Sequence, residues 1–368
     1  MLYDILKKHN AEFFLQYASS KDANFYYSTS FKIHDPVLYA IGIDGTDLLV
    51  VPEMERDRAE KESRVKEIAS LADIGFYEYL REFKDPKKAL AFTYIDLFKA
   101  HKAKKLLIPP NFPSFLSFYL KDYFEVEVVE NPFSKLRMIK RKDEIEKIRD
   151  VSLAILKSLD YLLKKLNEIK TCEKLRDEIE LFLFKNGYLA EDTIVASGIE
   201  SANPHSIGFG SIEDHIVFDV FPKSRTHGYH SDFTRTIILN ENAEIEDMLN
   251  AVIEAQEKAI SMLKEGILAK DVHNLVCDVL ESLGYHTIRK KFKEGFIHST
   301  GHGIGLEVHE EPRIFENDQV LKAGMVVTIE PGLYYKKVGG VRVEDTVLIK
   351  KSGCEVLTPY RKEIKLFK

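Results

Sequence analysis

Two pairs of acidic residues in the second half of the chain lie in or beside apolar runs that are typical of β-strands. Asp219 interrupts His-Ile-Val-Phe-Asp-Val-Phe, and Asp232 opens Asp-Phe-Thr-Arg-Thr-Ile-Ile thirteen positions later. Glu330 ends Met-Val-Val-Thr-Ile-Glu, and Glu344 lies in Val-Arg-Val-Glu-Asp-Thr-Val. One acid at a strand end usually faces water, but a buried carboxylate is costly unless it is paired or binds a metal. Four of them indicate a shared positive partner.

A pair of divalent cations is the partner that this pattern favours. Arg235 and Arg342 are too few to neutralise four carboxylates, whereas two divalent ions suffice. His302 adds a nitrogen ligand in Gly-His-Gly-Ile-Gly, where the glycines allow close approach. Mostly oxygen ligands with one imidazole favour manganese, cobalt or iron(II) over a closed structural zinc site. Paired ions lower the pKa of a shared water, so the predicted chemistry is metal-assisted amide hydrolysis.

Three further histidines are candidates for the same site. His298 and His309 flank His302 in the sequence, and His205 follows Asn-Pro. A lone histidine is more often structural than catalytic. Three of them around a metal cluster would supply hydrogen-bond donors for the oxyanion and the leaving nitrogen of a tetrahedral intermediate.

The elements that must position these residues divide into two domains, 1–135 and 136–368. In the first, the alternation of helix and strand predicts an α/β fold. Asp85 followed by Pro86 predicts the start of a helix that runs to about residue 101. The first 18 residues read as one amphipathic helix. The predicted strands are 37–43, 48–51, 105–108 and 126–129, the first two forming a hairpin.

The second domain is predicted to mix helices and strands, so the whole chain is of the α/β (α+β) class. A long helix starts at Asp143, and helices dominate to about residue 186. Apolar residues at 3.6-residue spacing predict a helix over 270–283, after another over 243–264. Strands are expected at 194–197, 215–221 and 232–239 and again in the last 65 residues. Asp219 and Asp232 should therefore lie side by side on adjacent antiparallel strands.

Composition excludes several other classes of function. The net charge of −6 arises from 53 basic and 59 acidic residues spread along the chain, which predicts neither nucleic-acid nor membrane binding. The basic clusters at 140–142 and 289–291 read as solvated helix ends or loops. Three separated cysteines indicate a reducing compartment, and Cys277 reads as a buried structural thiol rather than a nucleophile. Without a visible targeting or spanning segment, a cytoplasmic protein is expected.

Four motifs in register resemble the metallopeptidase family of the pita-bread fold, which includes methionine aminopeptidase, aminopeptidase P, prolidase and creatinase. They cover about residues 140–360 and comprise Asp219 with Ser231–Thr236, His298–Pro312, Thr328–Tyr334 and Gly340–Thr346. The segment Arg137–Ile145 and the α/β first domain resemble the branch of prolidase, aminopeptidase P and creatinase. The resemblance thus implies a creatinase-like N-terminal domain followed by a pita-bread catalytic domain.

The same resemblance implies a role for each candidate residue. Asp232 and Glu344 would bridge two divalent ions, Asp219 would hold one of them, and His302 and Glu330 the other. Manganese or cobalt is favoured, with iron(II) and zinc as alternatives. Glu330, His309 and His205 are the expected catalytic residues, with Glu330 as proton carrier and His309 as oxyanion donor. His298 and His205 would contact substrate, and Arg342 would fix a carboxylate. A homodimer is also implied.

The leading functional hypothesis is an Xaa-Pro dipeptidase, which acts on small peptides with proline in second position. Aminopeptidase P, which acts on longer Xaa-Pro peptides, shares every motif, and methionine aminopeptidase is a distant third. A non-catalytic binding protein would be expected to have lost ligands, and none is lost. The chain departs from the family by having Val220-Phe221 after Asp219 and a longer spacing to Asp232. A differently shaped hairpin tip is therefore expected, with an effect on substrate length.

Overall fold

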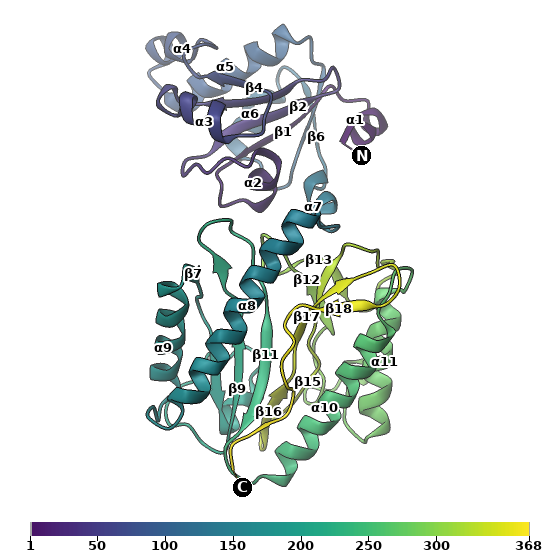
Figure 1. Cartoon of the computed structure of the whole chain (residues 1–368). Helices are drawn as coiled ribbons and strands as arrows, with labels where there is room; N and C mark the ends of the chain where they lie inside the picture. The colour runs from purple at the N-terminus through teal and green to yellow at the C-terminus, as the bar shows by residue number, and fades with distance from the viewer. Residues whose placement is uncertain (1, 368) are drawn as a thin grey trace. The chain divides into compact units, whose positions relative to one another are not determined.

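The computed structural model describes residues 2–367 and divides the chain into two compact units, Met1–Arg137 and Met138–Lys368 (Figure 1). The first unit contains a six-stranded sheet of order β4-β3-β2-β1-β5-β6. Its strands are β1 (Phe13–Ala18), β2 (Val37–Gly42), β3 (Asp47–Val51), β4 (Glu67–Ser70), β5 (Lys105–Ile108) and β6 (Glu125–Val128). The β1–β2 and β2–β3 pairs are antiparallel and the remaining pairs are parallel.

Helices cover both faces of this sheet because alternate strand residues point to opposite sides. Phe13 and Leu15 join one core with residues of α5 and α6, whereas Phe14 joins a second core with residues of α1–α3 and α7. The helices are α1 (Leu2–His9), α2 (Ala23–Thr29), α3 (Arg56–Glu62), α4 (Phe76–Phe83), α5 (Pro86–Ala100), α6 (Ser114–Leu120) and α7 (Pro132–Arg137), with a 3₁₀ turn at Glu53–Glu55. The unit is therefore a three-layer α/β fold.

The predicted start of α5 is confirmed, because the Asp85 side chain accepts hydrogen bonds from the backbone of Lys87 and Lys88 with Pro86 in the first turn. The prediction of a single helix over the first 18 residues is wrong. The helix ends at His9, and Phe13–Ala18 is the central strand β1. An apolar run long enough for either structure is assigned by its tertiary partners.

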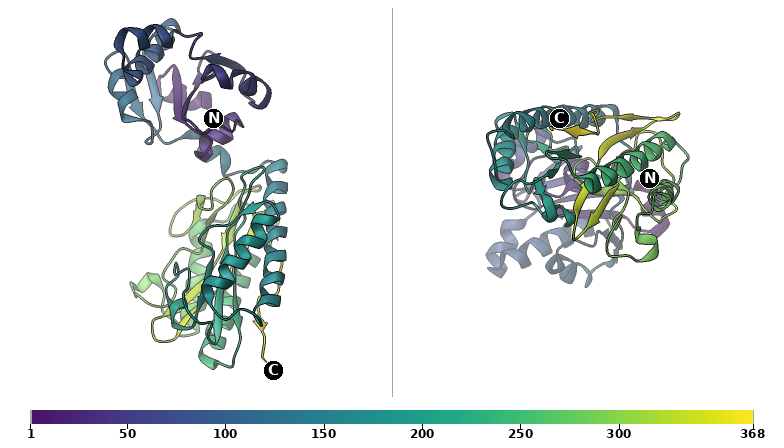
Figure 2. Two further views of the ribbon diagram at one scale, coloured as in Figure 1. Left: turned by 90° about the vertical axis from the view of Figure 1, so that its left-hand side faces the viewer. Right: turned by 90° about the horizontal axis from the view of Figure 1, so that it is seen from below.

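The second unit packs two pairs of helices around strands. Its helices are α8 (Lys142–Lys165), α9 (Cys172–Lys185), α10 (Ala243–Met262) and α11 (Ala269–Ser282), with 3₁₀ turns at Gly198–Ala202 (η2) and Ile288–Lys290 (η3). In Figure 1 the α8–α9 pair and the α10–α11 pair lie on opposite sides of the strands, and the view from below in Figure 2 shows the same separation. Each pair covers its own hydrophobic core.

The strands of this unit form two main sheets, a hairpin and a short two-stranded pair. One sheet has the order β19-β11-β9-β8, with β8 (Ile194–Ser197), β9 (His215–Val220), β11 (Phe233–Ile238) and β19 (Ile364–Lys365). The other has the order β13-β12-β14-β17-β18, with β12 (Gly301–Gly303), β13 (Glu310–Ile314), β14 (Val326–Ile329), β17 (Asp345–Ile349) and β18 (Cys354–Val356). The hairpin joins β15 (Gly332–Tyr335) to β16 (Gly339–Arg342), and the two-stranded pair joins β7 (Tyr188–Leu189) to β10 (Lys223–Ser224).

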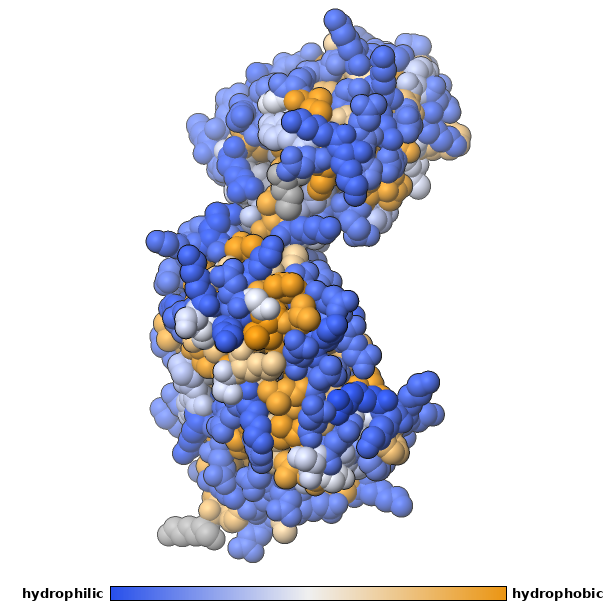
Figure 3. Space-filling model, turned by 90° about the vertical axis from the view of Figure 1, so that its right-hand side faces the viewer, coloured by the Kyte–Doolittle hydropathy of each residue, from blue (hydrophilic) through white to orange (hydrophobic). Residues whose placement is uncertain are grey.

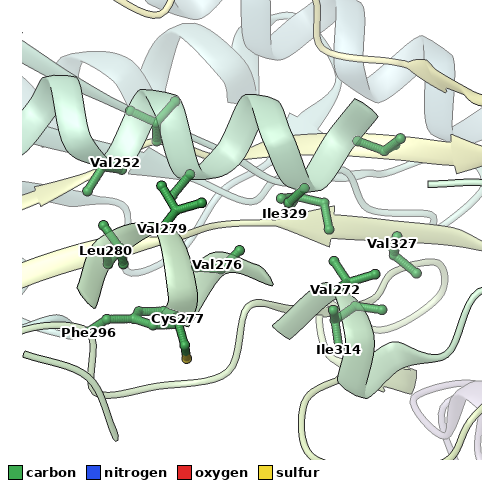
Figure 4. Packing of buried hydrophobic residues seen from close by; sticks show 14 of the residues in the cluster. Val252, Val272, Val276, Cys277, Val279, Leu280, Phe296, Ile314, Val327 and Ile329 are labelled. Carbon is green, nitrogen blue, oxygen red and sulfur yellow. The ribbon is translucent and has the colours of Figure 1, made fainter. Parts of the chain in front are cut away.

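The core under α10 and α11 shows why this half of the unit folds as it does. Val272, Val276 and Val279 form the apolar stripe of α11, and they pack with Val252 of α10 and Ile329 of β14 (Figure 4). The stripe predicted for this helix is thus confirmed. Cys277 is also fully buried in this core, as its position in the apolar helix predicted. Burial of these side chains holds β14 against the helices.

Polar residues cover most of the face seen in Figure 3, and hydrophobic residues gather in a band on the second unit. Among the described residues, no helix combines the length and apolarity that crossing a membrane requires.

Candidate active site

Each predicted metal-binding carboxylate lies in a strand or close to the end of one. Asp219 is in β9, Asp232 precedes β11, Glu330 follows β14 and Glu344 lies between β16 and β17. In β9 and β11, Phe218 and Phe233 point into the core under α8 and α9, so Asp219 and Asp232, one residue away, point to the opposite face. The two strands pair antiparallel with Thr234 opposite Asp219, which confirms that the two acids lie on adjacent strands. Strand alternation therefore explains how acids can occur within apolar runs.

The second pair of acids follows the same rule. Ile329 and Val343 belong to the core under α10 and α11, so Glu330 and Glu344 point away from it. β14 pairs antiparallel with β17, with Ile329 opposite Asp345, and this register brings the two glutamates together. A bridge between Thr234 and Glu344 joins the two halves of the unit, so the four carboxylates converge where the inner faces meet.

His302 completes the cluster. One ligand atom each of Asp232, His302 and Glu344 lies within 4.8 Å of the others, and all three residues are buried. His302 Nε2 is 3.7 Å from Asp232 Oδ2 and 3.4 Å from Glu330 Oε1. These distances bring together four of the five predicted ligands, and Asp219 lies opposite Thr234, which itself bridges to Glu344.

The hydrogen bonds of these residues test whether a metal would fit. His302 Nδ1 donates to the carbonyl of Gly303, 3.1 Å away, so the neutral ring presents the lone pair of Nε2 to the carboxylates. Asp219 Oδ1 and Glu344 Oε1 are buried without a hydrogen-bond partner. Acceptor atoms that face one another need a proton or a cation between them. The donor set of oxygens and one imidazole nitrogen thus fits divalent metal ions.

The pKa values of these side chains in the metal-free protein agree with a site for divalent metal ions. Burial raises the pKa of Asp232 and Glu344 well above the usual range, and neighbouring carboxylates raise it further. Burial also raises the pKa of Glu330 to about 8 and lowers that of His302 to about 3. The three raised values reflect the cost of burying negative charges together, and the lowered value of His302 reflects the cost of burying an imidazolium.

These shifts predict that the metal-free protein loses stability as the pH rises. Because folded Glu330 keeps a proton that the unfolded chain releases near pH 4.5, its contribution is complete below 4.5 and is lost as the pH rises toward 8. His302 acts oppositely, but only below its ordinary pKa of 6.5. Between pH 6.5 and 8, urea unfolding of chelator-treated protein should therefore show a loss of roughly 1–2 kcal/mol from Glu330. Glu330→Gln should make this slope shallower, while Asp232 and Glu344, whose pKa values are also raised, continue to contribute to it. An unchanged slope would contradict the assignment.

Arg342 joins the carboxylate cluster to Tyr334 and, through it, to His298. Its Nη2 donates to Asp219 Oδ2 at 2.7 Å, and its Nη1 donates to the Tyr334 hydroxyl at 2.7 Å and to the Pro204 carbonyl at 3.2 Å. Tyr334 in turn donates to His298 Nε2, at 3.1 Å, because His298 Nδ1 donates to the carbonyl of Ser299. Burial lowers the pKa of His298 to about 3, so its ring is neutral and this direction of hydrogen bonding is consistent.

The remaining two histidines lie at the open side of the cluster. The ring centroids of His309 and His302 are 4.3 Å apart, and His309 is exposed. Burial of part of its ring lowers its pKa, so the ring is neutral near pH 7 and has one N–H to donate. His205 is also exposed and follows Pro204, whose carbonyl Arg342 contacts. His205 and His309 are therefore accessible to a ligand.

Sequence reasoning missed two contributors. Tyr334 was only part of a motif, although the glycines around it were a usable signal: a Cβ at Gly332 or Gly340 would lie within 2.7 Å of the tyrosine ring or hydroxyl. Lys140 was read as part of a solvated basic cluster, and this is wrong. Its side chain is 2% exposed and pairs with Glu310 at 2.6 Å.

The altered hairpin between Asp219 and Asp232 bends toward the α8–α9 side. Its residues Lys223–Ser224 form β10, which pairs with β7, and Arg225 N donates to the Gly187 carbonyl. On the return, the Tyr229 hydroxyl contacts Glu144 at the start of α8. The tip is thus held by the outer layer of the unit.

Comparison with known proteins agrees with this geometry. Residues 146–351 match the metallopeptidase family M24. The chain is 34% identical over 332 residues to an Xaa-Pro dipeptidase of Pyrococcus furiosus, which covers 88% of the chain and 87% of the relative.

Solved structures with the same fold carry both names that the sequence left open. The prolidase of Pyrococcus horikoshii superposes with a TM-score of 0.81 at 30% identity over 98% of this chain and 97% of that one. An X-Pro aminopeptidase of Thermotoga maritima superposes with a TM-score of 0.80 at 27% identity over 97% and 98%. The inward-facing carboxylates, the buried histidine and these matches together show that the chain is a metallopeptidase of family M24, in the branch of the prolidases and aminopeptidases P.

Proposed function

We propose that this protein is a metal-dependent Xaa-Pro dipeptidase. The observation that carries the proposal is the convergence of His302 Nε2 with carboxylate oxygens at 3.4–3.7 Å, beside the unpartnered oxygens of Asp219 and Glu344. The named relatives support the substrate class, because a Xaa-Pro dipeptidase is 34% identical over most of its length. The residues that would hold two divalent ions are Asp219, Asp232, His302, Glu330 and Glu344.

The proposed mechanism divides the chemistry between the metals and the chain. Bound divalent ions would supply a hydroxide nucleophile near neutral pH by lowering the pKa of water. Arg342 holds Asp219 in place through its hydrogen bond of 2.7 Å. Glu330, whose pKa is about 8 in the chain by itself, would carry a proton from the attacking water to the leaving amine. His309 would donate its N–H to the carbonyl oxygen as negative charge develops there.

The substrate is expected to lie among three of the histidines. His205 and His309 are accessible, and His298 is fixed by Tyr334. His205 and His298 would thus contact a small peptide that has proline in second position. We further propose manganese or cobalt as the working metal, since oxygen-rich sites with one imidazole suit both ions, and a homodimer as the working assembly.

The discriminating experiment compares Leu-Pro with a longer Xaa-Pro-Yaa peptide, each with manganese or cobalt and each with a chelator. We expect metal-dependent release of proline from the dipeptide and weaker cleavage of the longer peptide. Preferential cleavage of the longer peptide would instead assign aminopeptidase P activity. Cleavage of neither peptide with any of manganese, cobalt, iron(II) or zinc would overturn the proposal.

A substitution at His309 should separate metal binding from turnover. His309→Ala removes the proposed oxyanion donor but none of the five ligands, so bound metal should be unchanged while kcat falls by roughly 10²–10³-fold. Metal content and steady-state kinetics measured on the same preparation check this. Full activity in the variant would remove His309 from the mechanism.

A further inference from the structure

A buried ion pair lies directly behind the loop that carries His309. Lys140 Nζ is 2.6 Å from Glu310 Oε1, and the two side chains are only 2% and 7% exposed. Lys140 lies just before α8, 170 residues away in sequence, whereas Glu310 is the residue after His309. A buried ion pair adds little net stability, because desolvation offsets the attraction. Its effect is instead to hold two segments in one geometry.

The carboxylate of Glu310 also restrains the other end of the same loop. A Cβ at Gly305 would lie 2.6 Å from Glu310 Oε1, so the glutamate passes directly over this glycine. The Gly305 carbonyl accepts a hydrogen bond of 2.7 Å from His230 N, in the return of the long hairpin. The two ends of the loop 305–309 thus lie together, because Gly303 also pairs with Glu310 between β12 and β13, and the hairpin holds the Gly305 end through this hydrogen bond.

Lys140 is itself fixed in place. Its backbone N–H donates to the Gly324 carbonyl at 2.8 Å, and Ile139 forms a bridge with Met325, the residue before β14. β14 leads directly to Glu330. The ion pair therefore fixes the loop that carries His309 relative to β14, the strand that leads to the predicted metal ligand Glu330.

We infer that Lys140 and Glu310 are positioning residues for His309, holding its imidazole toward the metal cluster through the closed 305–309 loop. This inference rests on the proposed function, since it assigns His309 a role in turnover. Neither residue touches the substrate or the metals in this scheme, and both act only through the histidine.

A double-mutant cycle tests that dependence. Lys140→Met should lower kcat for Leu-Pro hydrolysis with manganese by roughly 10- to 100-fold, as loss of an outer-shell partner does, with bound metal unchanged. In the His309→Ala background the same substitution should lower kcat by less than about twofold, because the side chain it positions is absent. Equal losses in both backgrounds, or a wild-type kcat for Lys140→Met, would overturn the inference. Lys142→Met, at an exposed neighbouring lysine, is the matched control and should behave as wild type.

A second variant keeps the test decisive if Lys140→Met does not fold. Replacing both partners, Lys140→Met with Glu310→Met, removes the unpaired buried charge, and such replacements commonly recover folding. We expect this variant to unfold near the wild-type temperature while kcat remains low. A wild-type kcat would show that the ion pair has no positioning role.

A measurement that does not depend on catalytic turnover tests this inference separately from the proposed function. In metal-free protein with ¹³C-labelled histidine, the His309 ring signal, identified by its loss in His309→Ala, should shift in Lys140→Met and not in Lys142→Met. An unshifted signal would overturn the inference even if the enzyme is active. Conversely, a shifted signal in a protein that cleaves no Xaa-Pro peptide would contradict only the proposed function.

Discussion

Replacing Asp232 with asparagine should remove metal binding and peptidase activity together. A carboxylate oxygen of Asp232 lies within 4.8 Å of ligand atoms of both His302 and Glu344. An amide offers one neutral oxygen where the carboxylate offers two charged ones, so it cannot serve two cations. Without bound metal the nucleophile reverts to water of ordinary pKa, and kcat/KM should fall by at least about 10⁴-fold.

Isothermal titration with manganese and hydrolysis of Leu-Pro check this result on the same sample. Asp143→Asn is the matched control, because its side chain is about half exposed and makes only surface ion pairs, so it should retain both properties. The variant should also be more stable than metal-free wild type at pH 8, since one of the repelling carboxylates is gone. Retained manganese binding would contradict a role for Asp232 in holding the metal, and retained activity without bound metal would contradict a metal-dependent reaction.

The largest effect on stability is expected at Arg235, on the opposite face of the same strand. Its guanidinium is fully buried and pairs with Asp345 at 2.8 Å. It also donates to the four backbone carbonyls of Thr234, Glu344, Tyr360 and Arg361. The ring of Phe233 lies 4.2 Å from its Cζ. Arg235 thus links β11 to the chain around Glu344 and to the C-terminal segment.

Arg235→Met should therefore lower the free energy of unfolding by about 3–5 kcal/mol, because it leaves Asp345 buried without its cation. Denaturant unfolding of metal-free protein measures the loss. Arg361→Met, which makes the same change at an exposed neighbour, should stay within about 0.5 kcal/mol of wild type. Adding Asp345→Asn to Arg235→Met should recover part of the loss, and strict additivity would contradict the pairing.

Arg235 and Arg342 show which contacts can be predicted from the alternation of residues along a strand and which cannot. Asp232, Thr234 and Thr236 share one face of β11, and Phe233 and Arg235 share the other. Alternation alone therefore assigns Arg235 to the helix side and away from the metals. That Arg342, and not Arg235, contacts Asp219 depends on which strand lies across the cluster, and no local pattern contains this information.

Much of the fold and of the candidate site could be predicted from the sequence alone. Local spacing predicted the helices under which the strands pack, the adjacent strands of Asp219 and Asp232, and the burial of Cys277, because a helix and a strand each impose a short repeat on the residues that face the core. The acids within apolar runs, with His302 between glycines, predicted the chemistry, since few other partners can compensate several buried carboxylates.

Only the tertiary structure decided how distant segments meet. It placed Lys140 in a buried ion pair with Glu310, 170 residues away, where the sequence suggested a solvated cluster. It made Phe13–Ala18 a central strand rather than a helix and linked Tyr334 to Arg342 and His298. In each case the deciding energy comes from burial against a partner remote in sequence, and the identity of that partner is set by how the sheets and helices pack as a whole.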